Sequence, residues 1–439
     1  MKHKLIYSYA KLDWLVIFCV FIFPVTFLTV RHGVHVSLFA LVLLAAFHFW
    51  SAKGSNIEFN YPLDALILLT FAGLFLSVLI SQAFRGAIHF AAFDGPSRIL
   101  LAGLAFLLLK SLNIPYIKIL SITIPVGLIC VFLSVQLNPG AYWAGRYATY
   151  FVDPNTLGSQ AFILGLLSLL MISFGGKKST ALIMLQALGG VLGLYVSIGS
   201  GSRGGWLTAP FILLLILFLR VGDISHANSY QKRKMWLQTI SICISIFFIF
   251  LIAFYFSENL STRVIGGYFD AKNWFSGSNL EGSVGIRLSM WMFGFQFAGE
   301  SLLYGYGEEK NMMLVLQNSP LNVLANKVAI DTMAGTGPHS DILSKLLSAG
   351  FFGLGAYLSL LAVPFSIFWK RRNALDFNVK QAARIGLFYI TGIFIAGLSN
   401  EQLSLKYLCT FYGLMIAVLL AQVLHKSALG QINPVSSSS

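Results

Sequence analysis

Long apolar runs, repeated along most of the sequence, restrict this chain to very few folds. Runs of about 17 to 25 apolar residues can cross a bilayer as helices, and twelve such runs are present. With 57% hydrophobic residues, 10% charged residues and a mean hydropathy of +0.77, the composition excludes a soluble domain of this size. The sequence therefore predicts an all-α integral membrane protein of about twelve transmembrane helices. The predicted spans are 13–30, 34–51, 62–82, 96–112, 119–137, 155–175, 180–198, 205–221, 236–256, 340–369, 383–400 and 405–424.

The basic residues predict how these helices are oriented. An even number of spans leaves both termini on one side, and if that side is the cytoplasm the inner loops contain 18 of the 30 Lys and Arg residues. Cytoplasmic loops carry such an excess, so we expect both ends in the cytoplasm. Residues 1–256 then hold spans one to nine, 257–338 form an outer segment, 339–425 hold spans ten to twelve, and 426–439 form a cytoplasmic tail.

The basic residues of the outer face differ in type from the inner ones. The remaining 12 of the 30 basic residues lie in outer loops, and seven of these 12 are arginines. Only five of the 18 inner basic residues are arginines. Arginine pairs with phosphate through two parallel hydrogen bonds, so the outer face is predicted to hold phosphate or another polyanion. Alternatively, individual arginines lie at the lipid interface or pair with outer acids such as Asp94 and Asp153. The outer arginines are Arg31, Arg85, Arg98, Arg146, Arg203, Arg263 and Arg287.

One outer segment, residues 257–338, is much longer than a connector. Its 82 residues include the amphipathic stretch "IRLSMWMFGFQFAGE", in which Arg287, Trp291, Gly294 and Ala298 share one helical face. A second amphipathic stretch, "NMMLVLQNSPLNVLANKVA", follows it. Unstructured loops of this length are uncommon, so we expect a small helical cap.

His339 stands at the outer mouth of the tenth predicted span. Gly337 and Pro338 should end any helix before it, and Ser340 or Asp341 can cap the helix that follows. On a continuous helix, Gly350 and Gly353 would return to within about 40° of the His339 direction. Glycines let another helix approach closely, and the helix dipole favours a neutral ring that can accept a proton. His339 is thus a candidate general base; otherwise it is a cap or an interfacial residue.

Two other outer segments carry arginines among residues suited to binding. In "SIGSGSRGGWL", glycines and serines surround Arg203, which is either a phosphate-binding arrangement or a short glycine-rich hairpin. In "NPGAYWAGRYATYFVDPNTLGSQ", Arg146 is accompanied by Trp143 and three tyrosines. Aromatic faces suit sugar rings and the headgroup region equally well.

Several kinds of site are not indicated. The four cysteines all lie in apolar runs, and neither paired carboxylates, apart from Glu308 and Glu309, nor histidines cluster at metal-ligand spacing. Walker A, dinucleotide-binding and G-x-S-x-G motifs are missing from the sequence. If the chain is an enzyme, we expect arginines and helix ends to supply the positive charge.

The segment that begins at His339 resembles a known family. His339 and Ser340, followed after nine residues by Gly350 and after two more by Gly353, match a signature of bacterial O-antigen ligases. "SGSRGG" and "VDPNTLGSQA" are similar to stretches of the wider superfamily of O-antigen ligases and polymerases. Together with the predicted spans and the outer segment, the resemblance covers nearly the whole chain.

This resemblance implies a GT-C-type glycosyltransferase in the bacterial inner membrane. It would act at the periplasmic face without metal or other cofactor, and would take no nucleic acid partner. The donor would be O-antigen glycan on undecaprenyl pyrophosphate, and the acceptor a sugar hydroxyl of lipid A core oligosaccharide. The anomeric centre would be inverted, with His339 as base. Arg203 and Arg287 are the first choices for contacts with pyrophosphate, followed by Arg146 and Arg263, and then by Arg98 and Arg31 near span boundaries.

Other functions fit the same sequence features. An O-antigen polymerase, or a protein ligase that modifies pilin, would use the same donor with a different acceptor. A transporter of lipid-linked glycans also fits twelve spans. Against a transporter stand the lack of a repeat between the two halves and the long segment lying on one face.

Overall fold

The computed structural model describes residues 2–51, 59–137, 145–173, 179–225, 257–307 and 327–425, with isolated positions 143, 230, 232, 233, 236, 237, 240, 254 and 255. Within these ranges the chain is helical and contains no strand. Two short 3-10 turns, Phe90–Phe93 and Gly299–Ser301, accompany the α-helices. The α-helices are α1 (Lys2–Thr26), α2 (Gly33–Ser51), α3 (Leu63–Arg85), α4 (Asp94–Ser111), α5 (Tyr116–Leu137), α6 (Pro154–Ser173), α7 (Thr180–Ser200), α8 (Arg203–Trp206), α9 (Thr208–Ser225), α11 (Glu258–Phe275), α12 (Ser283–Ala298), α14 (Lys327–Thr336), α15 (Asp341–Arg371), α16 (Phe377–Gly397) and α17 (Lys406–Leu424).

Ten helices in the described ranges are long and apolar enough to span a membrane. They are α2 to α7, the run Arg203–Ile224 that joins α8 and α9, and α15 to α17. The expected all-α membrane architecture is therefore confirmed. The first predicted span falls on α1, whereas the ninth, 236–256, lies almost wholly outside the described residues.

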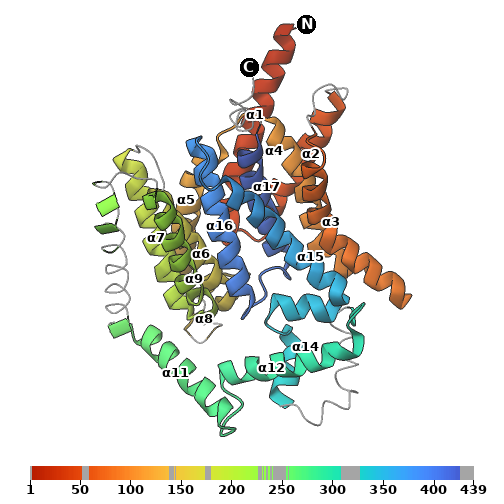
Figure 1. Cartoon of the computed structure of the whole chain (residues 1–439), viewed down its shortest axis with the longest axis vertical. Coiled ribbons are helices and arrows are strands. Elements are labelled where there is room, and N and C mark those ends of the chain that lie inside the picture. Colours follow the sequence, from red (N-terminus) through yellow and green to blue (C-terminus); the bar gives the residue numbers. More distant parts are fainter. Residues whose placement is uncertain are drawn as a thin grey trace.

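The bundle is built around α17. This helix is apolar on all sides and almost wholly buried, as a helix without a polar face must be. It packs against α2, α4, α5 and α16. The beginning of α1 and the end of α17 lie at the same end of the bundle (Figure 1).

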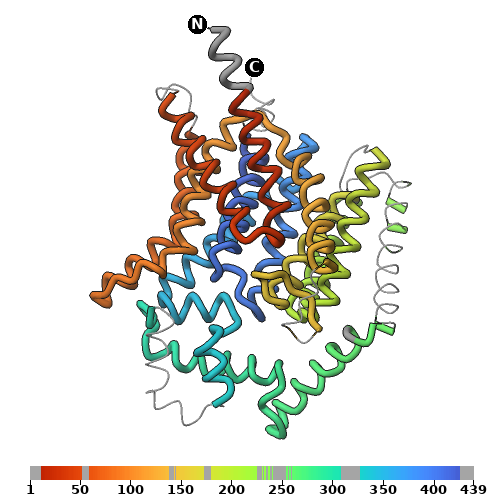
Figure 2. Tube along the Cα trace, turned by 180° about the vertical axis from the view of Figure 1, so that it is seen from behind, coloured from red at the N-terminus to blue at the C-terminus, as the bar shows by residue number. Residues whose placement is uncertain are grey.

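Helices α11, α12 and α14 gather at the opposite end of the bundle (Figures 1 and 2). In both views α11 lies on the side of α7 and α9, while α12 and α14 lie on the side of α15 (Figures 1 and 2). The expected helical content is present in α11, α12 and α14, but the second amphipathic stretch lies mostly outside the described residues. A separate apolar core joins α12 and α14 to the start of α15; it contains Met290, Phe293, Phe297, Ala298, Ala329, Ile330, Met333, Leu343, Leu346 and Leu347.

Helix α15 is broken, contrary to the continuous helix assumed from the sequence. Ala349 has φ −137° and ψ 18°, and Gly350 has φ 61° and ψ −149°. The angular count from His339 to Gly350 and Gly353 is therefore wrong, because it runs across a change of direction. Nor does the expected cap form: Ser340 occupies the N-cap position without a side-chain cap hydrogen bond.

A non-helical stretch, residues 302–307, enters the break in α15. Tyr306 and Gly307 donate their backbone N–H groups to the carbonyls of Leu347 and Ser348 at 2.7 and 3.0 Å, and Phe351 donates to the carbonyl of Leu302 at 2.8 Å. These bonds satisfy polar backbone groups that the break would otherwise leave unpaired in an apolar setting. Gly350 thus leaves space for the 302–307 stretch. It does not serve, as expected from the sequence, to let a neighbouring helix pack below His339.

Candidate active site

His339 lies in a sharp turn between α14 and α15. Its backbone φ is 50°, a left-handed value that is uncommon for residues other than glycine. The ring Nε2 is 3.2 Å from the hydroxyl oxygen of Thr336, the last residue of α14. The Asn400 side chain, in the loop between α16 and α17, lies next to the ring and raises its pKa. Side chains from two other segments, α14 and the loop between α16 and α17, therefore lie against the imidazole.

The surroundings of His339 keep its ring neutral. Burial and the guanidinium of Arg287 lower the pKa of His339 from 6.5 to about 4, while Asp153 and Asn400 oppose this with smaller effects. At neutral pH the ring therefore carries a lone pair that can accept a proton. A neutral ring was expected from the helix dipole, but here burial and Arg287 cause it.

Arg203 and Arg287 meet at the start of α12. Arg203 Nη1 lies 3.3 Å from Asp270 Oδ2 and 3.2 Å from the hydroxyl oxygen of Ser283. Arg287 Nη1 donates to the backbone carbonyl of the same Ser283 at 2.8 Å. The structure thus brings together two arginines that are 84 positions apart in the sequence.

Arg146 and Arg263 meet at the end of α7. A Cβ atom at Gly201 would lie 3.2 Å from Arg263 Nε and 3.6 Å from Arg146 Nε. Arg146 Nε donates to the carbonyl of Ser200 at 2.7 Å, and its Nη2 donates to Asn155 Oδ1 at 2.7 Å. Gly201 has φ 65° and ends α7 in the left-handed conformation that glycine favours. This turn leads directly to Arg203 at the start of α8.

These four side chains, Arg146, Arg203, Arg263 and Arg287, form a cluster of like charges that we call the arginine cluster. Burial, followed by the charges of the other three arginines, lowers the pKa of Arg146 from 12.5 to about 10. Burial and Arg203 likewise lower the pKa of Arg287. Guanidinium groups that depress one another in this way create a strong preference for an anion.

One hydrogen-bond donor in the cluster is unused. Arg203 Nε is buried and has no hydrogen-bond partner among the described residues. Buried donors are nearly always satisfied, so an unpaired guanidinium N–H indicates a place for an acceptor. An anion with several oxygens, such as a pyrophosphate, fits both this donor and the charge of the cluster.

Residues 188–358 match the sequence profile of a family described as O-Antigen ligase. This part of the chain is therefore similar to the O-antigen ligase family. The chain is also 23% identical over 376 residues to a protein of Haemophilus influenzae described only as uncharacterized, covering 84% of this chain and 88% of that protein.

The O-antigen ligase match contains most of the candidate site. Arg203, Arg263, Arg287 and His339 lie inside residues 188–358, as does the break in α15. Arg146 and Asn400 lie outside that range and reach the site through the fold. Within the described ranges, no group of three or more His, Cys, Asp and Glu side chains is placed to hold a metal ion.

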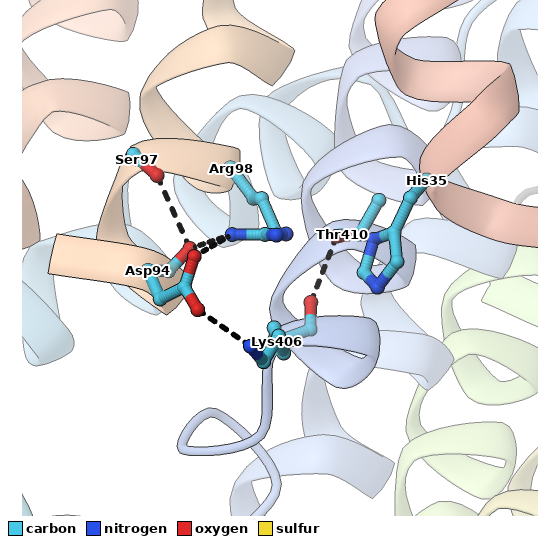
Figure 3. A network of polar contacts seen from close by, with 6 residues as sticks. All are labelled: His35, Asp94, Ser97, Arg98, Lys406 and Thr410. Carbon is cyan, nitrogen blue, oxygen red and sulfur yellow. Dashed lines mark hydrogen bonds and ion pairs between the residues drawn. The ribbon is translucent and has the colours of Figure 1, made fainter. Parts of the chain in front are cut away.

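Arg98 and Arg31 are not brought to the arginine cluster by any contact described above. Arg98 Nη1 donates to Asp94 Oδ1 at 2.7 Å, and Lys406 Nζ donates to Asp94 Oδ2 at 2.6 Å, in a network that links α4 to α17 (Figure 3). His35 on α2 joins this network at its edge, because its Nδ1 lies 2.9 Å from the hydroxyl of Thr410 (Figure 3). The Arg31 backbone N–H donates to the Tyr150 hydroxyl at 2.8 Å, and its side chain is exposed.

The sequence analysis missed the contribution of the loop between α16 and α17. Asn400 contacts the His339 ring, and the carbonyl of Ser399 accepts a hydrogen bond from Arg287 Nε at 3.2 Å. A usable signal was present in the run "SNEQ", residues 399–402, four consecutive polar residues between two apolar runs. Polar groups placed between two apolar helices need hydrogen-bond partners, so this run indicates contacts with other polar segments.

Proposed function

We propose that this protein is an O-antigen ligase that transfers glycan from undecaprenyl pyrophosphate to a sugar hydroxyl of lipid A core oligosaccharide. The observation that carries the proposal is a neutral, half-buried histidine beside an arginine cluster with an unused donor. In this proposal the site faces the periplasm of a bacterial inner membrane, both termini are cytoplasmic, and residues 257–338 form a periplasmic cap.

The arginine cluster has the chemistry needed by the donor. The pyrophosphate carries several negatively charged oxygens, and guanidinium groups bind such oxygens through paired hydrogen bonds. As the bond between the sugar and pyrophosphate breaks, negative charge grows on the departing oxygen. Arginines fixed in place before the reaction stabilise that charge without further rearrangement. They supply the positive charge that this scheme requires, so the proposal includes no cofactor.

His339 has the chemistry needed by the acceptor. The neutral ring takes the proton of the acceptor hydroxyl as its oxygen bonds to the anomeric carbon. The bond from that carbon to the pyrophosphate oxygen breaks, and its electron pair leaves with the pyrophosphate. Attack from the side opposite the leaving group inverts the anomeric centre.

Donor binding would also make His339 a stronger base. Its pKa of about 4 is far below the value suited to proton transfer at neutral pH, partly because Arg287 lies close by. A pyrophosphate bound to Arg287 would offset that positive charge and raise the pKa of the ring. His339 would then acquire its full basicity only when the donor is in place.

A reconstituted reaction distinguishes the candidate functions. Purified protein is mixed with undecaprenyl pyrophosphate-linked glycan and lipid A core oligosaccharide in the presence of a chelator, and products are separated by gel and mass spectrometry. We expect glycan joined to lipid A core. Longer lipid-linked glycan would instead indicate a polymerase, and glycan on added pilin a protein ligase. Glycan movement across proteoliposomes without any new linkage would indicate a transporter.

Arg203 offers a test of how the cluster binds the donor. We expect Arg203→Lys to lower kcat/KM for the donor by about 10- to 100-fold, because a lysine cannot reproduce paired contacts from a planar fork. The measurement is steady-state transfer with varied donor concentration. The matched control is Arg31→Lys, an exposed arginine on the same outer face. Full activity of Arg203→Lys would show that only the charge at this position is needed.

A further inference from the structure

The loop between α16 and α17, residues 398–405, contacts both halves of the candidate site. Its Ser399 carbonyl accepts a hydrogen bond from Arg287, and its Asn400 side chain contacts His339. Consecutive residues of one loop therefore touch the proposed phosphate-binding arginine and the proposed base. Any shift of this loop would move both contacts together.

Asp341 anchors this loop to the segment that carries His339. The side chain is buried, and its two carboxylate oxygens accept backbone N–H groups of Gln402 and Leu403, each at 2.9 Å. The end of α16 approaches equally closely, since a Cβ at Gly397 would lie 2.6 Å from Asp341 Oδ2. Burying a carboxylate is costly unless its oxygens are hydrogen-bonded, so this pairing holds the loop in one register.

The backbone of Asn400 is held on both sides. Its N–H donates to the carbonyl of Ala396 at 3.0 Å, and its carbonyl accepts from Gln402 Nε2 at 3.0 Å. Gln402 is itself held by Gln160 on α6, whose Nε2 donates to Gln402 Oε1 at 2.7 Å. With its main chain fixed, Asn400 can place its side chain only within a small region, which includes the His339 ring.

The side-chain amide of Asn400 is not fully hydrogen-bonded within the fold. Its Nδ2 is buried without a hydrogen-bond partner among the described residues. Leaving such a buried donor unpaired destabilises the fold. An asparagine with a purely structural role would be expected to form hydrogen bonds through both its amide oxygen and its amide N–H groups. The Asn400 side chain instead lies against the His339 ring.

We propose that Asn400 is a positioning residue for His339, orienting the imidazole through its amide, and that the buried Asp341 carboxylate holds Asn400 in place. The contacts form a closed path from His339 through Asp341 to Gln402, and back through Asn400 to the ring. This inference rests on the proposed function for its chemical meaning, since the ring is oriented for proton transfer. It assigns a role to two residues outside the arginine cluster.

The charged groups around the ring come from four segments. Arg287 approaches from α12 and Asp153 from the residue before α6. Glu401, next to Asn400, reaches Gly337, because a Cβ at Gly337 would overlap the Glu401 carboxylate. Asp341 follows His339 by two residues and bonds to the loop backbone. A charged side chain at position 400 would change the pKa of the His339 ring directly, in addition to the effects of these four groups.

Titration of the His339 ring tests the contact without relying on turnover. The full-length protein in nanodiscs, with 13C-labelled histidine, is titrated by NMR, and His339 is assigned by the signal lost in His339→Gln. Asn400→Asp places a carboxylate at the same position, and we expect the ring pKa to rise by about 1 to 3 pH units. Ser404→Ala, in the same loop, removes a hydroxyl without a hydrogen-bond partner in the described chain and should leave the titration unchanged.

Transfer kinetics supply the second readout. We expect Asn400→Ala to lower kcat by about 10- to 100-fold with little change in donor KM, because the ring loses its orientation while the arginines remain. Melting temperature in detergent separates this effect from misfolding. If Asn400→Asp does not fold, Asn400→Ala is titrated in its place, and the ring pKa should fall. A ring titration like that of Ser404→Ala in every folded variant would overturn the inference. If wild-type protein transfers no glycan, the proposed function fails, but the titration still decides the contact.

Discussion

Replacing His339 with alanine is expected to lower glycan transfer by at least about 100-fold, up to about 10,000-fold, because general-base catalysis contributes that much to a proton-transfer step. The loss should fall on kcat, since the arginine cluster that binds the donor is left intact. The measurement is the reconstituted reaction with purified His339→Ala protein, together with binding of the pyrophosphate-linked donor by the same variant.

His32 provides the matched control for this substitution. It is an exposed histidine in the turn between α1 and α2, and His32→Ala should transfer glycan at the wild-type rate. Normal transfer by His339→Ala would eliminate the role of base. A large rise in donor KM or Kd with kcat preserved would instead make His339 a ligand of the pyrophosphate.

The pH dependence provides an independent check on the same residue. With the pKa of free His339 at about 4, kcat/KM should stay level from neutral pH downward and fall only as the ring becomes protonated near that value. In the donor complex the pyrophosphate offsets Arg287, so the acid limb of kcat should lie at higher pH than that of kcat/KM. His339→Gln should lack both limbs.

The spans were predictable from the sequence because the bilayer imposes a length and a composition on each helix. The assignment of seven arginines to one outer face stays a prediction, based on the distribution of basic residues between loops. The sequence could not predict which of these arginines would lie close together. Arg203 and Arg287 both bind Ser283 at the start of α12, and Arg203 also pairs with Asp270 on α11. These contacts depend on how α11 and α12 pack in the folded protein. Arg98 is the exception, because its pairing with Asp94 four residues earlier was visible as an i, i+4 spacing.

The break in α15 could not be predicted from periodicity. Glycines at 350 and 353 are compatible with close helix packing in a membrane, which was the interpretation adopted. What distinguishes the two cases is the 302–307 stretch, which lies more than 40 residues earlier in the chain and supplies the N–H groups for Leu347 and Ser348. Local sequence carries no information about that partner.

Two side chains on α3 hold the inserted stretch in place. Ser81 donates its hydroxyl to the carbonyl of Tyr304, and Arg85 Nη1 donates to the same carbonyl at 3.3 Å. Arg85 also reaches the carbonyl of Ser348 at 3.5 Å, at the end of the first half of α15. The break is therefore a joint between α3, the outer segment and the helix that begins beside His339.

Gly350→Ala is expected to disrupt this joint. A Cβ at position 350 would overlap the carbonyl of Leu303 and lie 2.6 Å from that of Leu302, and the backbone conformation, φ 61° with ψ −149°, strongly disfavours any side chain. We expect a loss of stability of about 1 to 3 kcal/mol or more, seen as a lower melting temperature in detergent. Glycan transfer should fall as well, because the half of α15 before the break carries the turn of His339.

Gly355→Ala is the matched control, since it makes the same change five residues further along the same helix. A Cβ at position 355 meets no atom within 4 Å, and alanine suits a helix interior better than glycine by about 1 kcal/mol. This variant should keep or raise the melting temperature and retain transfer. If Gly350→Ala were as stable and active as Gly355→Ala, the 302–307 stretch could not be seated in the break as described, and α15 would run through position 350 as an ordinary helix. Comparing these two glycines of α15 thus tests whether Gly350, in the signature that begins at His339, is needed for helix packing or for the break in the helix.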